Sequence, residues 1–260
     1  MPILGNKPAN VICLCAIFAA KEQSHMQTGK DQEKENQLVQ SFLFVRQAIG
    51  LLGLALPVVL LGSTLFGVKK QTSISGFYYT QMGDVLVGTM CAIGVFLLSY
   101  KGYRNRPGER LSDKITARIA GVSAIGIALF PVGLENDCGV CNDTGFTFHP
   151  SLIHYVFAGI FFASLAVFSI ALFTRCDRTE HGKIVWTRRN RFYVGYGIVI
   201  IMAIIALVIY FLQPDKQASR DRYNYLFLWE SIGVFAFAAS WLAKGRALQG
   251  LGQLFSKLRR

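Results

Sequence analysis

The sequence predicts an all-α fold, a multi-pass bundle of six transmembrane helices with both termini in the cytoplasm. Its 260 residues are 52% hydrophobic and 16% charged, whereas about a quarter of the residues in soluble domains are charged. The apolar residues fall in long blocks that approach the roughly 20 residues needed to cross a bilayer. This composition excludes collagen-like, disordered and small disulfide-stabilised proteins. The net charge of +12 comes from Lys and Arg beside the apolar blocks, which is typical of membrane orientation, so no nucleic-acid partner is expected.

Six apolar segments, separated by polar loops, are the predicted spans. They comprise residues 47–68, 82–100, 117–134, 152–174, 192–212 and 226–243. Small residues recur inside them, as in Gly121 with Gly126 and Gly195 with Gly197. Such residues let helix backbones approach closely in lipid.

The distribution of Lys and Arg predicts the orientation. Residues 21–46, 101–118, 175–191 and the C-terminal tail together carry 21 of them, and the alternate loops carry five. Cytoplasmic loops are enriched in Lys and Arg. This places both termini in the cytoplasm and favours an even number of spans.

The two ends of the chain flank a predicted transmembrane domain of residues 46–245. Residues 1–45 form an N-terminal extension whose apolar block, 11–20, is too short to span. A cleaved signal peptide is the alternative, but it would leave the following tail outside, against the charge count. Residues 246–260 fit a basic amphipathic helix on the anionic cytoplasmic leaflet, the alternative being a solvated tail.

Polar side chains gather near the predicted outer face, from which the second, fourth and sixth spans start. A carboxylate in the hydrocarbon costs on the order of 2.5–3.5 kcal/mol, so such groups usually face a cavity. We therefore expect an outward-facing polar pocket that binds a small molecule, a lipid or a partner protein, the alternative being solvated groups at headgroup depth. The candidate pocket residues are Ser73, Ser75, Tyr78, Tyr79, Asp84, His154 and Glu230.

Two kinds of chemistry are open at this pocket. Asp84, His154 and Glu230 are candidate metal ligands, with zinc as the cofactor that would activate a water. Alternatively, Ser73 or Ser75 would supply a nucleophile, with His154 as base and Asp84 or Glu230 orienting it. A serine before a helix is more often a cap or turn residue.

The outer loop between the third and fourth spans contains Cys138 and Cys141, followed by His149 and His154. Cysteine and histidine are zinc ligands, but the spacing is shorter than that of a zinc finger. In an oxidising compartment two such thiols pair with each other. A disulfide is therefore preferred to a metal site, and a metal site to redox catalysis.

Several stretches resemble a group of uncharacterised bacterial inner-membrane proteins: RQAIG at 46–50, SISGFYYT at 73–80 and GVFLLSYKGY at 94–103. A broader similarity, to DRAM-like and other small six-helix membrane families, rests on Ile74-Ser75, Phe130-Pro131 and His154. The resemblance covers about residues 45–245. It implies a multi-pass protein of the bacterial inner membrane and carries no established activity.

The expected function is therefore binding at an outer-face pocket, with no enzymatic activity that the sequence demonstrates. One alternative is a membrane-embedded, metal-dependent hydrolase of a lipid or amide substrate. A second is a proton-coupled transporter, in which the carboxylates would relay protons. The inner halves of the predicted spans offer hydroxyl groups but no carboxylate, which places the transporter last.

Overall fold

The computed structural model describes residues 41, 43–102, 111–133, 150–177, 187–221 and 223–245. The regular elements in these ranges are all helical, and no β-strand occurs among them. By its contacts the chain divides after Leu43, and the unit Phe44–Arg260 contains the bundle described below. The predictions for residues 11–20, the pair Cys138 and Cys141, and the tail 246–260 lie outside the described residues.

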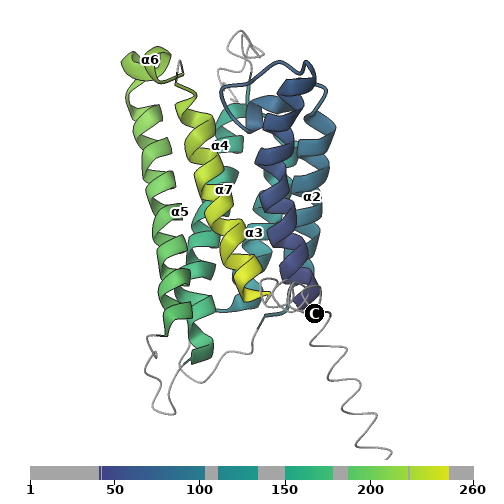
Figure 1. The fold of residues 1–260 in the computed structure, drawn as a ribbon, viewed down its shortest axis with the longest axis vertical. Coiled ribbons are helices and arrows are strands. Elements are labelled where there is room, and N and C mark those ends of the chain that lie inside the picture. The colour runs from purple at the N-terminus through teal and green to yellow at the C-terminus, as the bar shows by residue number, and fades with distance from the viewer. Residues whose placement is uncertain are drawn as a thin grey trace, which may run out of the picture. The chain divides into compact units, whose positions relative to one another are not determined.

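Each predicted span overlaps one long helix of the bundle (Figure 1). Four of these helices are long and apolar enough to cross a membrane, namely Leu43–Phe66, Ser151–Arg175, Arg188–Leu212 and Tyr225–Lys244. The other two have 17 residues each, α2 (Gly83–Ser99) and α3 (Asp113–Leu129). The long helix Ser151–Arg175 consists of α4 (Pro150–Val167), the π-helical turn η3 (Phe168–Leu172) and part of η4 (Phe173–Asp177). The remaining labelled elements are α5 (Arg188–Leu212), α7 (Tyr225–Lys244), and the short η1 (Thr64–Phe66), η2 (Ser75–Tyr79), η5 (Pro214–Lys216) and α6 (Gln217–Asp221).

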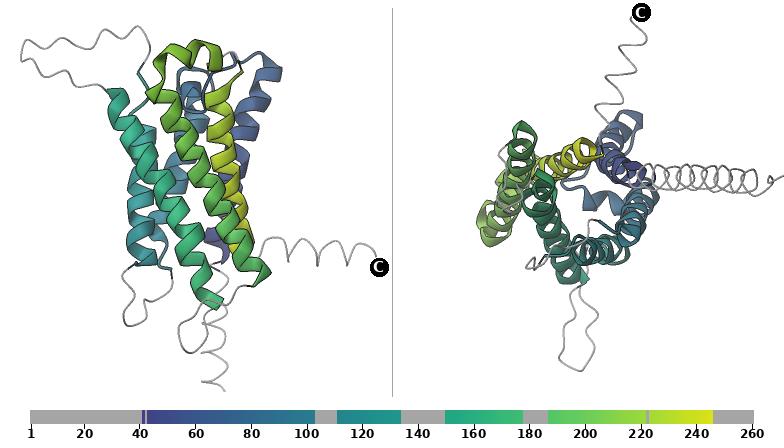
Figure 2. Two further views of the ribbon diagram at one scale, coloured as in Figure 1. Left: turned by 90° about the vertical axis from the view of Figure 1, so that its left-hand side faces the viewer. Right: turned by 90° about the horizontal axis from the view of Figure 1, so that it is seen from below.

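Consecutive long helices run in opposite directions, so the bundle has two distinct ends (Figures 1 and 2). We call them the η2 end, where α2, α4 and α7 begin, and the Lys244 end, where α7 finishes. Seen along the bundle, α2, α3, α4, α5 and α7 follow one another around it (Figure 2). The first helix, Leu43–Phe66, packs against α7 through Gly50 and Gly53.

Glycines mark the places where helices approach most closely. A Cβ on Gly121 of α3 would lie 2.9 Å from the backbone oxygen of Gly94 in α2. Side chains of neighbouring helices would lie within 2.5 Å of a Cβ on Gly126 and 2.3 Å of one on Gly197. A Cβ on Gly195 would have open space, with no heavy atom of the described residues within 4 Å beyond its own stretch of helix. Three of the four glycines singled out in the sequence thus allow close packing.

Aromatic side chains fill the Lys244 half of the bundle. Trp241 is fully buried, and its ring lies 5.1 Å from that of Phe168, 5.3 Å from those of Phe173 and Tyr100, and 6.0 Å from that of Phe237. These tilted and edge-on arrangements suit the quadrupoles of the rings. The five rings, which we call the aromatic cluster, close this half of the interior.

Two cationic side chains are buried beside the aromatic cluster. Arg46 is 2% exposed, and its Nη2 donates to the Tyr100 hydroxyl at 2.9 Å. Lys244 is 8% exposed, and its Nζ donates to the carbonyl of Phe173 at 2.7 Å. Because a buried charge requires compensating contacts, these hydrogen bonds hold the first helix to the end of α2 and α7 to η4.

The end of α3 differs from the prediction. The helix stops at Leu129 instead of continuing to residue 134. Phe130 has extended backbone angles, φ −113° and ψ 90°. The residue before a proline avoids the helical region, so Pro131 accounts for the early stop. The carbonyls of the last turn are then left without helical N–H partners.

Candidate functional site

The segment between the first helix and α2, residues 67–82, folds inward at the η2 end, and we call it the η2 segment. Ser73 and Ile74 are each 6% exposed, and Phe77 is fully buried. Two backbone groups of the segment bond to α7: the N–H of Phe227 donates to the Thr72 carbonyl at 2.8 Å, and the N–H of Ile74 donates to Glu230. The segment is therefore a fixed part of the bundle interior.

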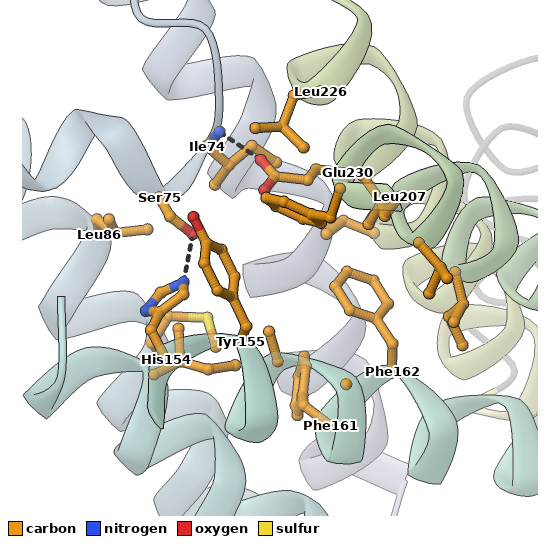
Figure 3. A pocket seen from close by; sticks show the side chains of 18 of the residues that line it. Ile74, Ser75, Leu86, His154, Tyr155, Phe161, Phe162, Leu207, Leu226 and Glu230 are labelled. Carbon is orange, nitrogen blue, oxygen red and sulfur yellow. Dashed lines mark hydrogen bonds between the residues drawn. The ribbon is translucent and has the colours of Figure 1, made fainter. Parts of the chain in front are cut away.

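A cavity of about 210 Å³ lies behind this segment (Figure 3). Its walls come from the first helix, the η2 segment, α2, α3, α4, α5 and α7. Four lining residues carry polar groups: Ser75, His154, Tyr155 and Glu230. The remaining wall is apolar and includes Phe161, Phe162 and Leu207. The cavity is therefore amphipathic, with its polar groups on the side of the η2 segment (Figure 3).

Ser75 and His154 form a directly hydrogen-bonded pair in the cavity wall. The Nε2 atom of His154 lies 2.9 Å from Ser75 Oγ, and its Nδ1 atom lies 2.7 Å from the carbonyl oxygen of Phe130. A carbonyl only accepts, so Nδ1 must carry the proton. In the neutral ring Nε2 then has the lone pair, and the Ser75 hydroxyl donates to it.

The position of the His154 ring follows from the end of α3. Because α3 stops before Pro131, the Phe130 carbonyl lacks a helical partner and accepts from His154 instead. In the serine-nucleophile alternative, Asp84 or Glu230 was expected to orient His154. The structure assigns that contact to a backbone carbonyl, so this prediction is wrong.

Glu230 and Tyr155 complete the polar end. Glu230 Oε2 accepts from the Ile74 N–H at 2.5 Å. Tyr155 follows His154 on α4, and Figure 3 shows its ring extending toward Ser75. The ring also packs on Phe211 of α5, at a centroid distance of 4.6 Å.

The cavity opens on the side of the bundle. The exposed residues in its lining are Tyr155 and Gly159 of α4 and Val208 and Phe211 of α5. Residues lining the cavity from the first helix, the η2 segment, α2, α3 and α7 are buried or half-buried. The opening therefore lies between α4 and α5.

Of the seven residues predicted for the pocket, three line this cavity: Ser75, His154 and Glu230. Asp84 is exposed and does not line it. Ser73 is buried, and its Oγ accepts from the N–H of Gly76 at 2.8 Å.

The two predicted tyrosines also lie elsewhere. Tyr78 packs edge-on against Tyr79, with 5.2 Å between the ring centroids. Tyr79 is exposed, and its hydroxyl donates to the Val132 carbonyl at 2.5 Å. Both side chains therefore help to anchor the η2 segment and are not part of the cavity wall.

The sequence analysis missed Tyr155 and the apolar wall of α4. The signal was present, because His154, Ala158 and Phe161 recur at helical spacing, with Tyr155, Gly159 and Phe162 directly beside them. Small residues at 158 and 159, between larger ones on the same face, leave the space that becomes the cavity.

In the described part of the chain, the predicted metal ligands do not come together as a group of three. No group of three or more His, Cys, Asp and Glu residues there could hold a metal ion. His154 and Glu230 share the cavity, but both nitrogens of His154 already have hydrogen-bond partners. Asp84 therefore does not converge with His154 and Glu230, the other two candidate zinc ligands.

The described residues define a class: they are all-helical in their regular structure, with four helices able to cross a membrane and an amphipathic internal cavity. Residues 61–247 match a family described as "Protein of unknown function (DUF998)", and the chain belongs to that family. The matched region includes the η2 segment and helices α2 to α7, and so nearly all of the cavity wall. No curated protein and no solved structure matches the chain.

Proposed function

We propose that the chain is a six-span integral membrane protein that holds an uncharged, single-chain amphiphile in the cavity between α4, α5 and α7. The observation that carries the proposal is the side opening, which joins an apolar cavity with a polar end to the surroundings of the apolar helices. In this arrangement the acyl chain occupies the space beside Phe162 and Leu207, and the polar group faces Ser75 and Glu230.

Six spans are supported by the lengths of α2 and α3. Each has 17 residues, the lower limit for a transmembrane helix, and 17 residues extend about 25 Å. Helix α3 packs against α4, which is apolar enough to cross, and α2 packs against α3. An even number of spans also agrees with the alternation of basic loops.

Charge supports an orientation with the η2 end outward, both termini in the cytoplasm, and a bacterial inner membrane as the location. Cytoplasmic ends are enriched in Lys and Arg. The described basic residues at the η2 end are Lys69, Lys70, Lys216 and Arg220. Those at or near the Lys244 end are Arg46, Lys101, Lys114, Arg118, Arg175, Arg188, Arg189, Arg191 and Lys244.

The volume and polar groups of the cavity restrict the ligand. A cavity of about 150 Å³ holds a molecule of benzene size, so about 210 Å³ accommodates part of one aliphatic chain and not a two-chain lipid. Among the described residues no Lys or Arg lines the cavity, so an anionic group at the polar end beside Glu230 would have no cationic partner. Hydroxyl groups of Ser75 and Tyr155 favour a ligand with an alcohol or ester, such as a monoacylglycerol.

The test is photo-crosslinking of the purified full chain with a monoacylglycerol that carries a diazirine in its acyl chain. We expect crosslinks on lining residues such as Phe162 and Leu207, and competition by excess unlabelled monoacylglycerol. Ala158→Trp fills the cavity and should reduce crosslinking at least tenfold. The matched control is Val156→Trp on the same helix, because Val156 is 51% exposed and outside the cavity wall.

Equal crosslinking in Ala158→Trp and Val156→Trp would contradict the proposal, since both variants would then report only contact with the helix surface. A fatty-acid anion that competes as well as the monoacylglycerol would remove the role given to Glu230.

The two other candidate functions have less support. A metal-dependent hydrolase needs a ligand set that the described residues do not bring together. A proton-coupled transporter needs a polar path toward the Lys244 end, where the aromatic cluster fills the interior.

A further inference from the structure

We infer that Ser75 and His154 act as nucleophile and general base toward a carboxylic ester of the aliphatic chain held in the cavity. The inference deepens the proposed function and depends on it, because the cavity must first bind the chain. The protein is then an ester hydrolase that needs no metal ion and transfers the acyl group to water.

The geometry of the pair is the first argument. A serine is activated when a neighbouring imidazole has its free lone pair directed at the hydroxyl and its other nitrogen held by an acceptor. Here Nε2 faces Ser75 Oγ at 2.9 Å, and Nδ1–H donates to the Phe130 carbonyl at 2.7 Å. His154 is 4% exposed, and its bond to the carbonyl fixes the tautomer in which Nε2 can take the proton.

The choice between the two serines of the segment is the second argument. Ser73 Oγ is engaged with the Gly76 N–H, and Ser73 lies outside the cavity wall. Ser75 lies in the wall, between the apolar space and the polar groups. A chain bound in the cavity therefore brings its ester group to Ser75.

Tyr155 supplies the third element, a donor for the negative charge that develops on the ester oxygen. Its ring extends toward Ser75 (Figure 3), and a tyrosine hydroxyl is a donor of the type found in oxyanion holes. The opening between α4 and α5 gives the leaving alcohol a way out.

The reaction balances with water alone. Ser75 Oγ bonds to the ester carbonyl carbon while its proton passes to Nε2 of His154. The carbon–oxygen bond to the alcohol then breaks, and the alcohol leaves with the proton from Nε2, which gives an acyl ester on Ser75. Water, deprotonated by His154, attacks this ester, the free acid is released, and the Ser75 hydroxyl is restored.

The test is covalent labelling of the purified full chain with a long-chain alkyl fluorophosphonate, which modifies only activated serines, followed by mass spectrometry. We expect one addition, located on Ser75, and none in Ser75→Ala. The control Ser63→Ala should label like the original protein, because Ser63 lies outside the cavity wall and donates to the Leu60 carbonyl. His154→Gln should label at least 100-fold more slowly, since a general base contributes about 10²–10⁴-fold.

The diazirine monoacylglycerol separates the two levels of the proposal. Crosslinking in the cavity without fluorophosphonate labelling of Ser75 overturns the inference and leaves the binding function standing. Absence of both signals overturns both. Thermal unfolding of Ser75→Ala and His154→Gln in detergent, with midpoints close to that of the original protein, shows that these variants are folded, so loss of labelling in them is chemical.

Discussion

Glu230 contributes to stability through the backbone of the η2 segment. Its carboxylate accepts from the Ile74 N–H at 2.5 Å, and a buried N–H without a partner costs about 1–3 kcal/mol. We expect Glu230→Leu to reduce the free energy of unfolding by this amount, and Glu230→Gln, which keeps an acceptor oxygen, to reduce it less. Thermal unfolding in detergent measures the difference. Equal losses in the two variants would show that the lost charge, and not the hydrogen bond, is responsible.

Tyr100 has a comparable role at the Lys244 end. Its hydroxyl accepts from both Nε and Nη2 of Arg46, at 3.2 and 2.9 Å. Tyr100→Phe keeps the ring in the aromatic cluster and removes this acceptor. We expect a loss of about 1–3 kcal/mol, because hydrogen bonds to charged groups are stronger than neutral ones, measured by the midpoint of thermal unfolding. An unchanged midpoint would mean that the other contacts of Arg46 suffice.

Asp84 and Glu230 show how far single residues are predictable from the sequence. Both are carboxylates near the start of an apolar helix, and both were predicted to face a pocket. Asp84 lies two positions before Leu86, which is buried, and two positions turn an α-helix by about 200°. Asp84 therefore points away from the interior. In helices that are apolar on every side, the sequence does not reveal which face is buried.

At the level of whole helices, the close contact between α2 and α3 depends on glycines, which have no side chain to hold the backbones apart. A Cβ on Gly121 would lie 2.9 Å from a backbone oxygen of α2, which cannot move without shifting the helix. Overpacking of this kind costs about 1–3 kcal/mol, so we expect Gly121→Ala to lower the midpoint of thermal unfolding. The matched control is Gly195→Ala, which has open space among the described residues and should be neutral or slightly stabilising.

The existence of each long helix could be predicted, because apolar runs of this length have few alternatives in lipid. The ends of the helices were predicted less accurately than their existence. The apolar residues Val132 and Leu134 extended the predicted third span beyond Pro131, whereas the backbone restriction before proline ends α3 at Leu129. The partner of His154 could not be predicted for the same reason, since it is a carbonyl freed by that ending.

For the whole molecule, the proposed orientation has a direct test. In a variant without native cysteines, we expect a single cysteine introduced by Lys70→Cys, at the η2 end, to react with a membrane-impermeant maleimide on intact cells. A cysteine introduced by Lys101→Cys, beyond the end of α2, should react only after the cells are opened. The reverse pattern would place the η2 end in the cytoplasm and contradict the count of basic residues.

The sequence does not predict that aromatic rings fill one half of the bundle interior while the other half contains a cavity. Aromatic residues such as Phe161, Phe168 and Trp241 occur along several helices, and nothing in their spacing distinguishes those that line the cavity from those that close the other half. That distinction arises only when α4, α5 and α7 are arranged around one another, with Ala158 and Gly159 at the gap.

The opening between α4 and α5 determines which concentration of ligand sets the fraction of cavities that are filled. A molecule that reaches the cavity from within the bilayer competes with the surrounding lipids, so its fraction among those lipids sets the occupancy, not its amount per litre of water. Diluting proteoliposomes with buffer would leave the cavity as full as before, whereas adding inert lipid to the same vesicles would empty it.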